Sequence, residues 1–163
     1  MSTLTVTLIL IHTLISIAAI LAGVPAVIDV FHSRSSSGSI RVFLVTAILT
    51  SATGFILPLA GVTPAVVVAI LALVILAAVL FARTKLLAGA LWRWIYAGGM
   101  VISLYLLFFV AIAQTFGKVG VLQASAPTAF PVTQGITLLI FVLLGLATVV
   151  KFRPSAGGRY AAA

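Results

Sequence analysis

Five long apolar runs, separated by short polar segments, limit what this chain can fold into more than any other feature. Hydrophobic residues make up 64% of the 163 residues and charged residues only 6%. A hydrocarbon core about 30 Å thick takes about 20 apolar residues to cross as an α-helix, and runs of this length do not match the short alternating strands of a membrane barrel. The sequence therefore predicts an all-α integral membrane helical bundle with five transmembrane helices, over about 5–30, 41–59, 64–82, 94–116 and 133–150.

Residues 1–153 are expected to form a single transmembrane helical domain. A signal peptide would require Lys or Arg before its apolar run. None precedes the first run of this chain, so this run is interpreted as a retained helix. Only residues 60–63 join the second and third runs, and a re-entrant pair that never crosses would give the same pattern. Two full crossings are preferred because each arm is long enough to span. Residues 154–163, rich in Gly and Ala, are expected to form a flexible cytoplasmic tail.

The positions of the nine Lys and Arg residues predict how the helices thread the membrane. Lys118 lies alone in the gap between the fourth and fifth runs. The other eight share one side of a five-helix bundle, and they are Arg34, Arg41, Arg83, Lys85, Arg93, Lys151, Arg153 and Arg159. Short loops rich in Lys and Arg stay in the cytoplasm, so the amino terminus is expected outside and the carboxyl terminus inside. A re-entrant pair would leave these charges on the same side, so the charges do not decide between the two arrangements.

The formal net charge of +8 is interpreted as a membrane signal and not as a nucleic-acid site. Basic residues at the cytoplasmic boundary attract anionic lipid headgroups, and no water-exposed stretch combines clustered basic residues with an interleaved aromatic face. One mixed run opens the fourth helix, where aromatic rings at headgroup depth anchor a helix and an Arg side chain reaches phosphate. We therefore expect anionic lipid as the partner here, and a membrane anchor made of Trp92, Arg93, Trp94 and Tyr96.

Asp29 is the only acidic residue of the chain, and it lies near the cytoplasmic end of the first helix. A carrier would use a carboxylate inside the membrane as a proton or cation site. The shallow depth of Asp29 instead favours an interfacial ion pair with Arg34 and Arg41.

A second group of polar residues is expected in the outer leaflet. His12 lies about 10 Å below the outer end of its helix at about 1.5 Å per residue, and other helices bring hydroxyl and amide groups to a similar depth. In one interpretation these groups bond their own or a neighbouring helix. In the other they form an outward-facing pocket for a small ligand, such as a quinone headgroup, or for a proton. The pocket residues would be His12, Thr50, Thr53, Gln114 and Gln134.

The residue types exclude most catalytic chemistry. The chain has no cysteine, hence no disulfide, thiol nucleophile or Cys-ligated metal, and it lacks a carboxylate pair, a Ser-His-Asp set and a metal-ligand cluster. His12 and His32 are about 30 Å apart along one helix, so they cannot ligate one haem within a monomer. A pair of His12 side chains across a homodimer is the one haem arrangement left. We predict no enzyme activity, no metal and no cofactor.

Four short strings resemble strings in small multi-span proteins of the bacterial inner membrane that have no assigned function. They are Ile11-His12-Thr13, Thr50-Ser51-Ala52-Thr53-Gly54-Phe55, Trp92-Arg93-Trp94-Ile95-Tyr96 and Ala126-Pro127-Thr128, and they extend over most of the chain. Those proteins often carry an acidic residue and a double proline after the last string, where this chain has Ala129-Phe130-Pro131. The resemblance implies a location in the bacterial inner membrane and draws attention to His12 and Thr53, but it implies no activity.

The lack of a catalytic set, the scarcity of charge and the small residues on helix faces favour a protein that works by association. We expect a non-catalytic accessory or structural subunit of a larger inner-membrane assembly, with other membrane subunits or further copies of this chain as partners. The alternative hypothesis is a small-molecule binder or small carrier for a quinone-like ligand, which would use the outer-leaflet pocket around His12.

Overall fold

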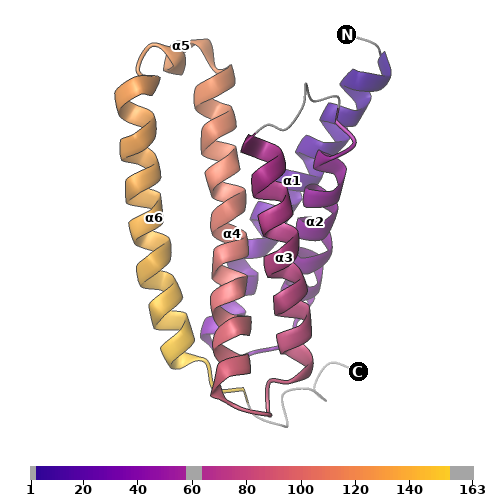
Figure 1. Cartoon of the computed structure of the whole chain (residues 1–163), viewed down its shortest axis with the longest axis vertical. Helices are drawn as coiled ribbons and strands as arrows, with labels where there is room; N and C mark the ends of the chain where they lie inside the picture. The colour runs from indigo at the N-terminus through magenta and orange to yellow at the C-terminus, as the bar shows by residue number, and fades with distance from the viewer. Residues whose placement is uncertain (1–2, 58–63, 155–163) are drawn as a thin grey trace.

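The structure, a computed structural model, describes residues 3–57 and 64–154, and these form helices and no strands. The long helices are α1 (Thr3–Phe31), α2 (Gly38–Gly54), α3 (Pro64–Thr84), α4 (Ala90–Lys118) and α6 (Ala126–Lys151), and α5 (Gly120–Gln123) is a single turn (Figure 1). The all-helical prediction is confirmed for this part of the chain. The expected tail beyond Pro154, with Arg159, and the connection at 60–63 lie outside the described residues.

Four of these helices, α1, α3, α4 and α6, are long and apolar enough to cross a membrane, so the chain is a membrane protein. α2 is shorter, with 17 residues, or about 25 Å at 1.5 Å per residue. The expected run of 41–59 is therefore not helical throughout. The helix begins earlier because Ser37 caps it by accepting a hydrogen bond from the Ile40 N–H, and it ends at Gly54, after which the Phe55 N–H bonds back to the Ala52 and Thr53 carbonyls.

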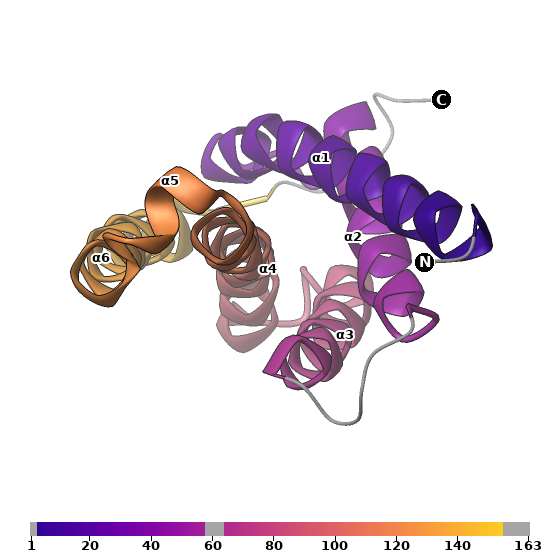
Figure 2. The same cartoon turned by 90° about the horizontal axis from the view of Figure 1, so that it is seen from above.

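The four helices α1 to α4 surround a common core, and α6 lies outside them on the flank of α4 (Figure 2). α1 packs on α2, α2 on α3, α3 on α4, and α4 again on α1. The helices alternate in direction, so the end where α1 and α3 finish is also the end where α2 and α4 begin (Figure 1). We call this the basic end, because every described Lys and Arg except Lys118 belongs to it, namely Arg34, Arg41, Arg83, Lys85, Arg93, Lys151 and Arg153.

The buried core lies in the half of the bundle nearest the basic end. On α1 the buried residues fall between Ala19 and Val30, and on α4 they fall between Tyr96 and Leu106. The largest fully buried side chains are Tyr96, Phe43, Phe152, Ile40, Leu76 and Met100. The opposite half, which we call the outer end, buries few side chains.

The segment 117–132, the gap between the fourth and fifth expected helices, is largely helical. α4 continues to Lys118, α5 follows at once, and α6 begins at Ala126 with a proline in its first turn and Pro131 inside the helix. Proline is tolerated in a first helical turn because its missing N–H has no partner there in any case. Pro127 therefore marks the start of a helix and Pro131 lies inside it, so the last long helix begins at Ala126 and not at about residue 133 as expected.

Two glycines allow the helices of the core to approach closely. A Cβ atom added to Gly23 of α1 would lie 2.5 Å from Leu104 Cδ1 of α4, and one added to Gly99 of α4 would overlap Val79 Cγ2 of α3. Val79 is completely buried, and its branched side chain has little freedom to rotate away. The contact between α3 and α4 therefore depends on the absence of a side chain at residue 99.

Replacing Gly99 by Ala is expected to lower the free energy of unfolding by about 1–3 kcal/mol, because the added methyl group overpacks a buried contact. The neighbouring Gly98 is a matched control, since its added Cβ would lie 3.5 Å from Val149 Cγ2, an ordinary contact distance. Unfolding of each purified variant in mixed detergent micelles would measure the difference. Equal stability of Gly99→Ala and Gly98→Ala would contradict this view of the interface.

Candidate functional site

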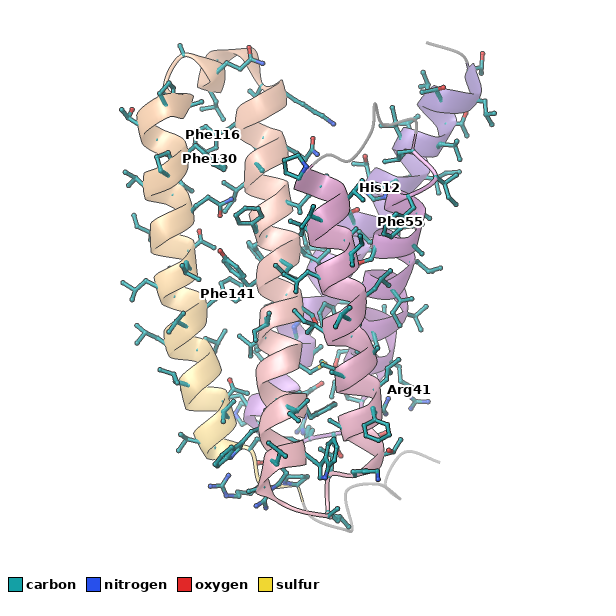
Figure 3. All side chains as sticks on the ribbon, in the orientation of Figure 1. His12, Arg41, Phe55, Phe116, Phe130 and Phe141 are labelled. Atoms are coloured by element: carbon teal, nitrogen blue, oxygen red, sulfur yellow. The ribbon has the colours of Figure 1, made fainter. Side chains whose placement is uncertain are left out.

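His12 and Thr53 are joined across the interface between α1 and α2. His12 Nδ1 lies 2.9 Å from Thr53 Oγ1, and His12 is half-buried near the outer end (Figure 3). The Thr53 hydroxyl donates its one hydrogen to the Leu49 carbonyl at 2.7 Å. Its oxygen must then accept from the imidazole, so we infer that His12 carries its hydrogen on Nδ1. Nε2 is left as an acceptor, the group with which this side chain could contact a ligand.

The other expected pocket residues lie at different helix interfaces. Gln134 of α6 donates from Nε2 to the Phe109 carbonyl of α4 at 3.0 Å. Gln114 is exposed and lines a shallow hollow between α3 and α4, together with Pro64 and Ala65. Thr50 is buried, and its hydroxyl has no hydrogen-bond partner among the described residues.

Among the described residues the structure thus brings His12 and Thr53 together, while Gln134 bonds α4 and Gln114 lines the hollow between α3 and α4. α6 lies on the side of α4 away from α2 (Figure 2), so Gln134 faces a different interface from Thr53. Counting residues gave the depth of each side chain. Counting could not give the direction in which each side chain points, because that depends on how its helix is rotated against its neighbours.

Asp29 links the end of α1 to the start of α2. Its Oδ1 forms an ion pair with Arg34 Nη1 at 3.1 Å, and its Oδ2 accepts a hydrogen bond from the Ser39 hydroxyl. Arg41 was expected as a second partner. Among the described residues Asp29 forms no ion pair with Arg41, which is exposed and points away from the bundle (Figure 3). A serine of α2 takes that place, so the carboxylate acts as a link between two helices.

A second link at the basic end joins the end of α6 to the α1–α2 turn. The Ser33 hydroxyl accepts from the Arg153 N–H at 2.9 Å and donates to the Lys151 carbonyl at 3.3 Å. The Tyr96 hydroxyl donates to the Ser35 carbonyl at 3.4 Å. The Tyr96 ring packs on the buried Phe152, with 5.4 Å between ring centroids. We call these contacts the clasp. Sequence analysis missed it because serines in a polar loop carry no signal of a distant partner.

The expected membrane anchor divides into exposed and buried rings. Trp94 is 51% exposed, as an interfacial anchor requires. Trp92 is half-buried and packs edge-on against Phe81 at 5.3 Å, with the Lys85 ammonium near both rings. Tyr96 is completely buried, so its assignment to the anchor is corrected: it belongs to the core and to the clasp.

Arg93 is the fourth residue of the expected anchor, and it is half-buried at the start of α4. Its Nε atom is buried and finds no acceptor in the described part of the chain. The position at the basic end agrees with the expectation, but the guanidinium is only partly available to headgroups.

No group of three or more His, Asp or Glu side chains that could hold a metal ion occurs within residues 3–57 and 64–154. Comparisons of the chain with protein-family models, with curated proteins and with solved structures find no match. What the arrangement can do must therefore be argued from its own residues.

The bond between His12 and Thr53 is expected to contribute a coupling energy of about 0.6 kcal/mol, the average for such bonds between membrane helices. A double-mutant cycle with His12→Leu and Thr53→Val, followed by unfolding in micelles, would measure it. Thr46→Val is the control, because among the described residues that hydroxyl bonds the Val42 and Phe43 carbonyls of its own helix. A coupling no larger than the one measured between His12 and Thr46 would show that the contact does not stabilise the fold.

Proposed function

We propose that this chain is a non-catalytic integral membrane protein, an accessory or structural subunit of an assembly in the bacterial inner membrane. The polar groups within the helices support this proposal. His12 bonds Thr53 and Gln134 bonds the Phe109 carbonyl, so these side chains already serve helix contacts. Polar side chains that tie helices together are common in membrane bundles, and they need no substrate.

The observation that carries the proposal is the apolar tip at the outer end, which we define as Val119, Val121 and Val132. These side chains are 44%, 87% and 60% exposed, and α5 buries none of its residues. Val119 and Val121 follow Lys118, where α4 ends, and we place them beyond the hydrocarbon region, with Val132 in the second turn of α6 at its edge. Exposed apolar groups outside hydrocarbon favour contact with another protein surface. The tip is therefore the surface we assign to a partner.

We further propose five crossings, with the amino terminus outside and the basic end in the cytoplasm. Short cytoplasmic loops are rich in Lys and Arg, which supports this orientation. α2 runs beside α1 and α3 (Figure 2), and its 17 residues cover most of a hydrocarbon core about 30 Å thick. A small tilt or local thinning of the bilayer would cover the rest.

Cysteine labelling tests this topology cleanly, because the chain has no cysteine of its own. Ile56, which follows α2, is 64% exposed, and Gln123 of α5 and Ala88 of the α3–α4 turn are also exposed. Single Cys variants at residues 56 and 123 should react with a membrane-impermeant maleimide in intact cells, and one at residue 88 only after permeabilisation. Labelling at 123 without labelling at 56 would indicate a re-entrant pair, and labelling at 88 in intact cells would reverse the orientation.

Photo-crosslinking tests the proposed partner surface. A benzoylphenylalanine at Val121 is expected to give a protein adduct in membranes of the native host, because the tip would lie against another subunit. The same group at Leu139, which is 60% exposed on α6, serves as the control and should react with lipid alone. Lipid adducts alone at both positions would contradict an association through the tip.

The alternative hypothesis, a binder or carrier of a quinone-like ligand, has one observation in its favour. His12 Nε2 remains an acceptor once Nδ1 donates to Thr53. It has less support than association, because Gln114 and Gln134 lie at other interfaces and do not complete a pocket around His12.

A further inference from the structure

An apolar groove runs along the outside of the bundle between α4 and α6. Its volume is about 230 Å³, and its walls include Gly98, Ile102, Tyr105, Phe141, Gly145 and Leu146. The groove is hollow because two of these residues have no side chain: Gly98 on α4 and Gly145 on α6. A Cβ atom added to Gly98 or Gly145 would lie in ordinary contact with a neighbour, at 3.5 Å from Val149 Cγ2 or 3.6 Å from Val101 Cγ1, so a larger side chain at either position would extend into the groove.

The groove faces hydrocarbon along the side of the bundle. Its rims are formed by Ile102, Val142 and Leu146, which are 47%, 46% and 62% exposed. From Leu138 to Leu146 it extends for about 12 Å along α6, at about 1.5 Å per residue. An empty groove would leave its walls without partner atoms on one side and lose dispersion contacts, and apolar walls offer nothing to a water molecule. A hydrocarbon chain is the occupant that this environment supplies.

The charges at one end of the groove select the kind of lipid. On α4, Trp94 lies one helical turn before Gly98 and therefore on the same face, and it is exposed. On α6, Lys151 and Arg153 follow the groove at the end of the helix. Neither α4 nor α6 contains an acidic residue, and the single acidic side chain of the sequence, Asp29, is paired with Arg34 on the α1 side. Within the described part of the chain the headgroup position at this end is thus positive, and Arg153 is its main basic group because the Lys151 ammonium lies over the Phe31 ring of α1.

We propose that the groove binds one acyl chain of an anionic phospholipid, whose phosphate lies at the basic end near Trp94 and Arg153. Basic residues at the cytoplasmic side of a membrane bundle attract anionic headgroups, and the exposed indole suits the same depth. The site needs no protein partner and so goes beyond the proposed association, while the choice of an anionic headgroup rests on the proposed orientation of the basic end.

Native mass spectrometry in mild detergent tests the acyl-chain part. The purified protein is incubated with an equimolar mixture of phosphatidylglycerol and phosphatidylcholine that carry the same acyl chains. We expect one retained phosphatidylglycerol on the unaltered protein and none on Gly145→Leu, whose side chain fills the groove. Gly135→Leu is the matched control on the same helix, because nothing lies within 4 Å of a Cβ atom added there. Equal retention by the two variants would overturn the proposal.

A charge variant tests the headgroup part and still decides the matter if Gly145→Leu does not fold. Arg153→Gln should lower the preference for phosphatidylglycerol over phosphatidylcholine about fivefold, the effect of one basic residue near the surface. Arg41→Gln removes the same charge from the same end but on the opposite side of the bundle (Figure 3), and it should leave the preference unchanged. Three results would each overturn the proposal. They are equal effects of the two substitutions, no preference in the unaltered protein, and a second copy of the chain bound in place of lipid.

Discussion

Helices in hydrocarbon gain nothing from hiding apolar surface from one another, because lipid tails are as apolar as their side chains. What holds them together is close packing and the few hydrogen bonds available between them. In this bundle the packing depends on Gly23 and Gly99, where the backbone of one helix meets a side chain of the next without an intervening Cβ. α4 has the central place between α1, α3 and α6, and its contacts with α1 and α3 include these two glycines.

The polar contacts make the two ends of the bundle different. At the basic end Asp29 joins α1 to α2, and Ser33 joins the α1–α2 turn to the end of α6, so these three helices are tied together beside a buried core. At the outer end His12 of α1 bonds Thr53 of α2, and α6 stands against α4 with the side chains of the apolar tip exposed. A closed basic end and an open outer end explain why we assign the partner surface to the tip and the lipid to the flank.

The candidate site shows where sequence reasoning reached its limit. Position along a transmembrane helix follows from counting residues, so the sequence alone places His12 and Thr53 at one depth. The direction of each side chain depends on how its helix is rotated against its neighbours, and that rotation is set by packing. This is why Gln134 lies against Phe109 on α4, and why Tyr96, in an aromatic run typical of an anchor, lies in the core.

The sequence by itself determined that the chain is helical and lies in a membrane. Its long apolar runs favour hydrocarbon, and in hydrocarbon a run of such length satisfies its backbone hydrogen bonds by forming a helix. It also placed most of the basic residues in alternate connections between the apolar runs. Only the tertiary structure decided that α6 stands outside the other four helices, that a serine replaces Arg41 beside Asp29, and that glycines leave a groove on the α4–α6 flank. These features depend on which face of each helix meets which neighbour, and the apolar residues on all faces of these helices leave that choice to packing.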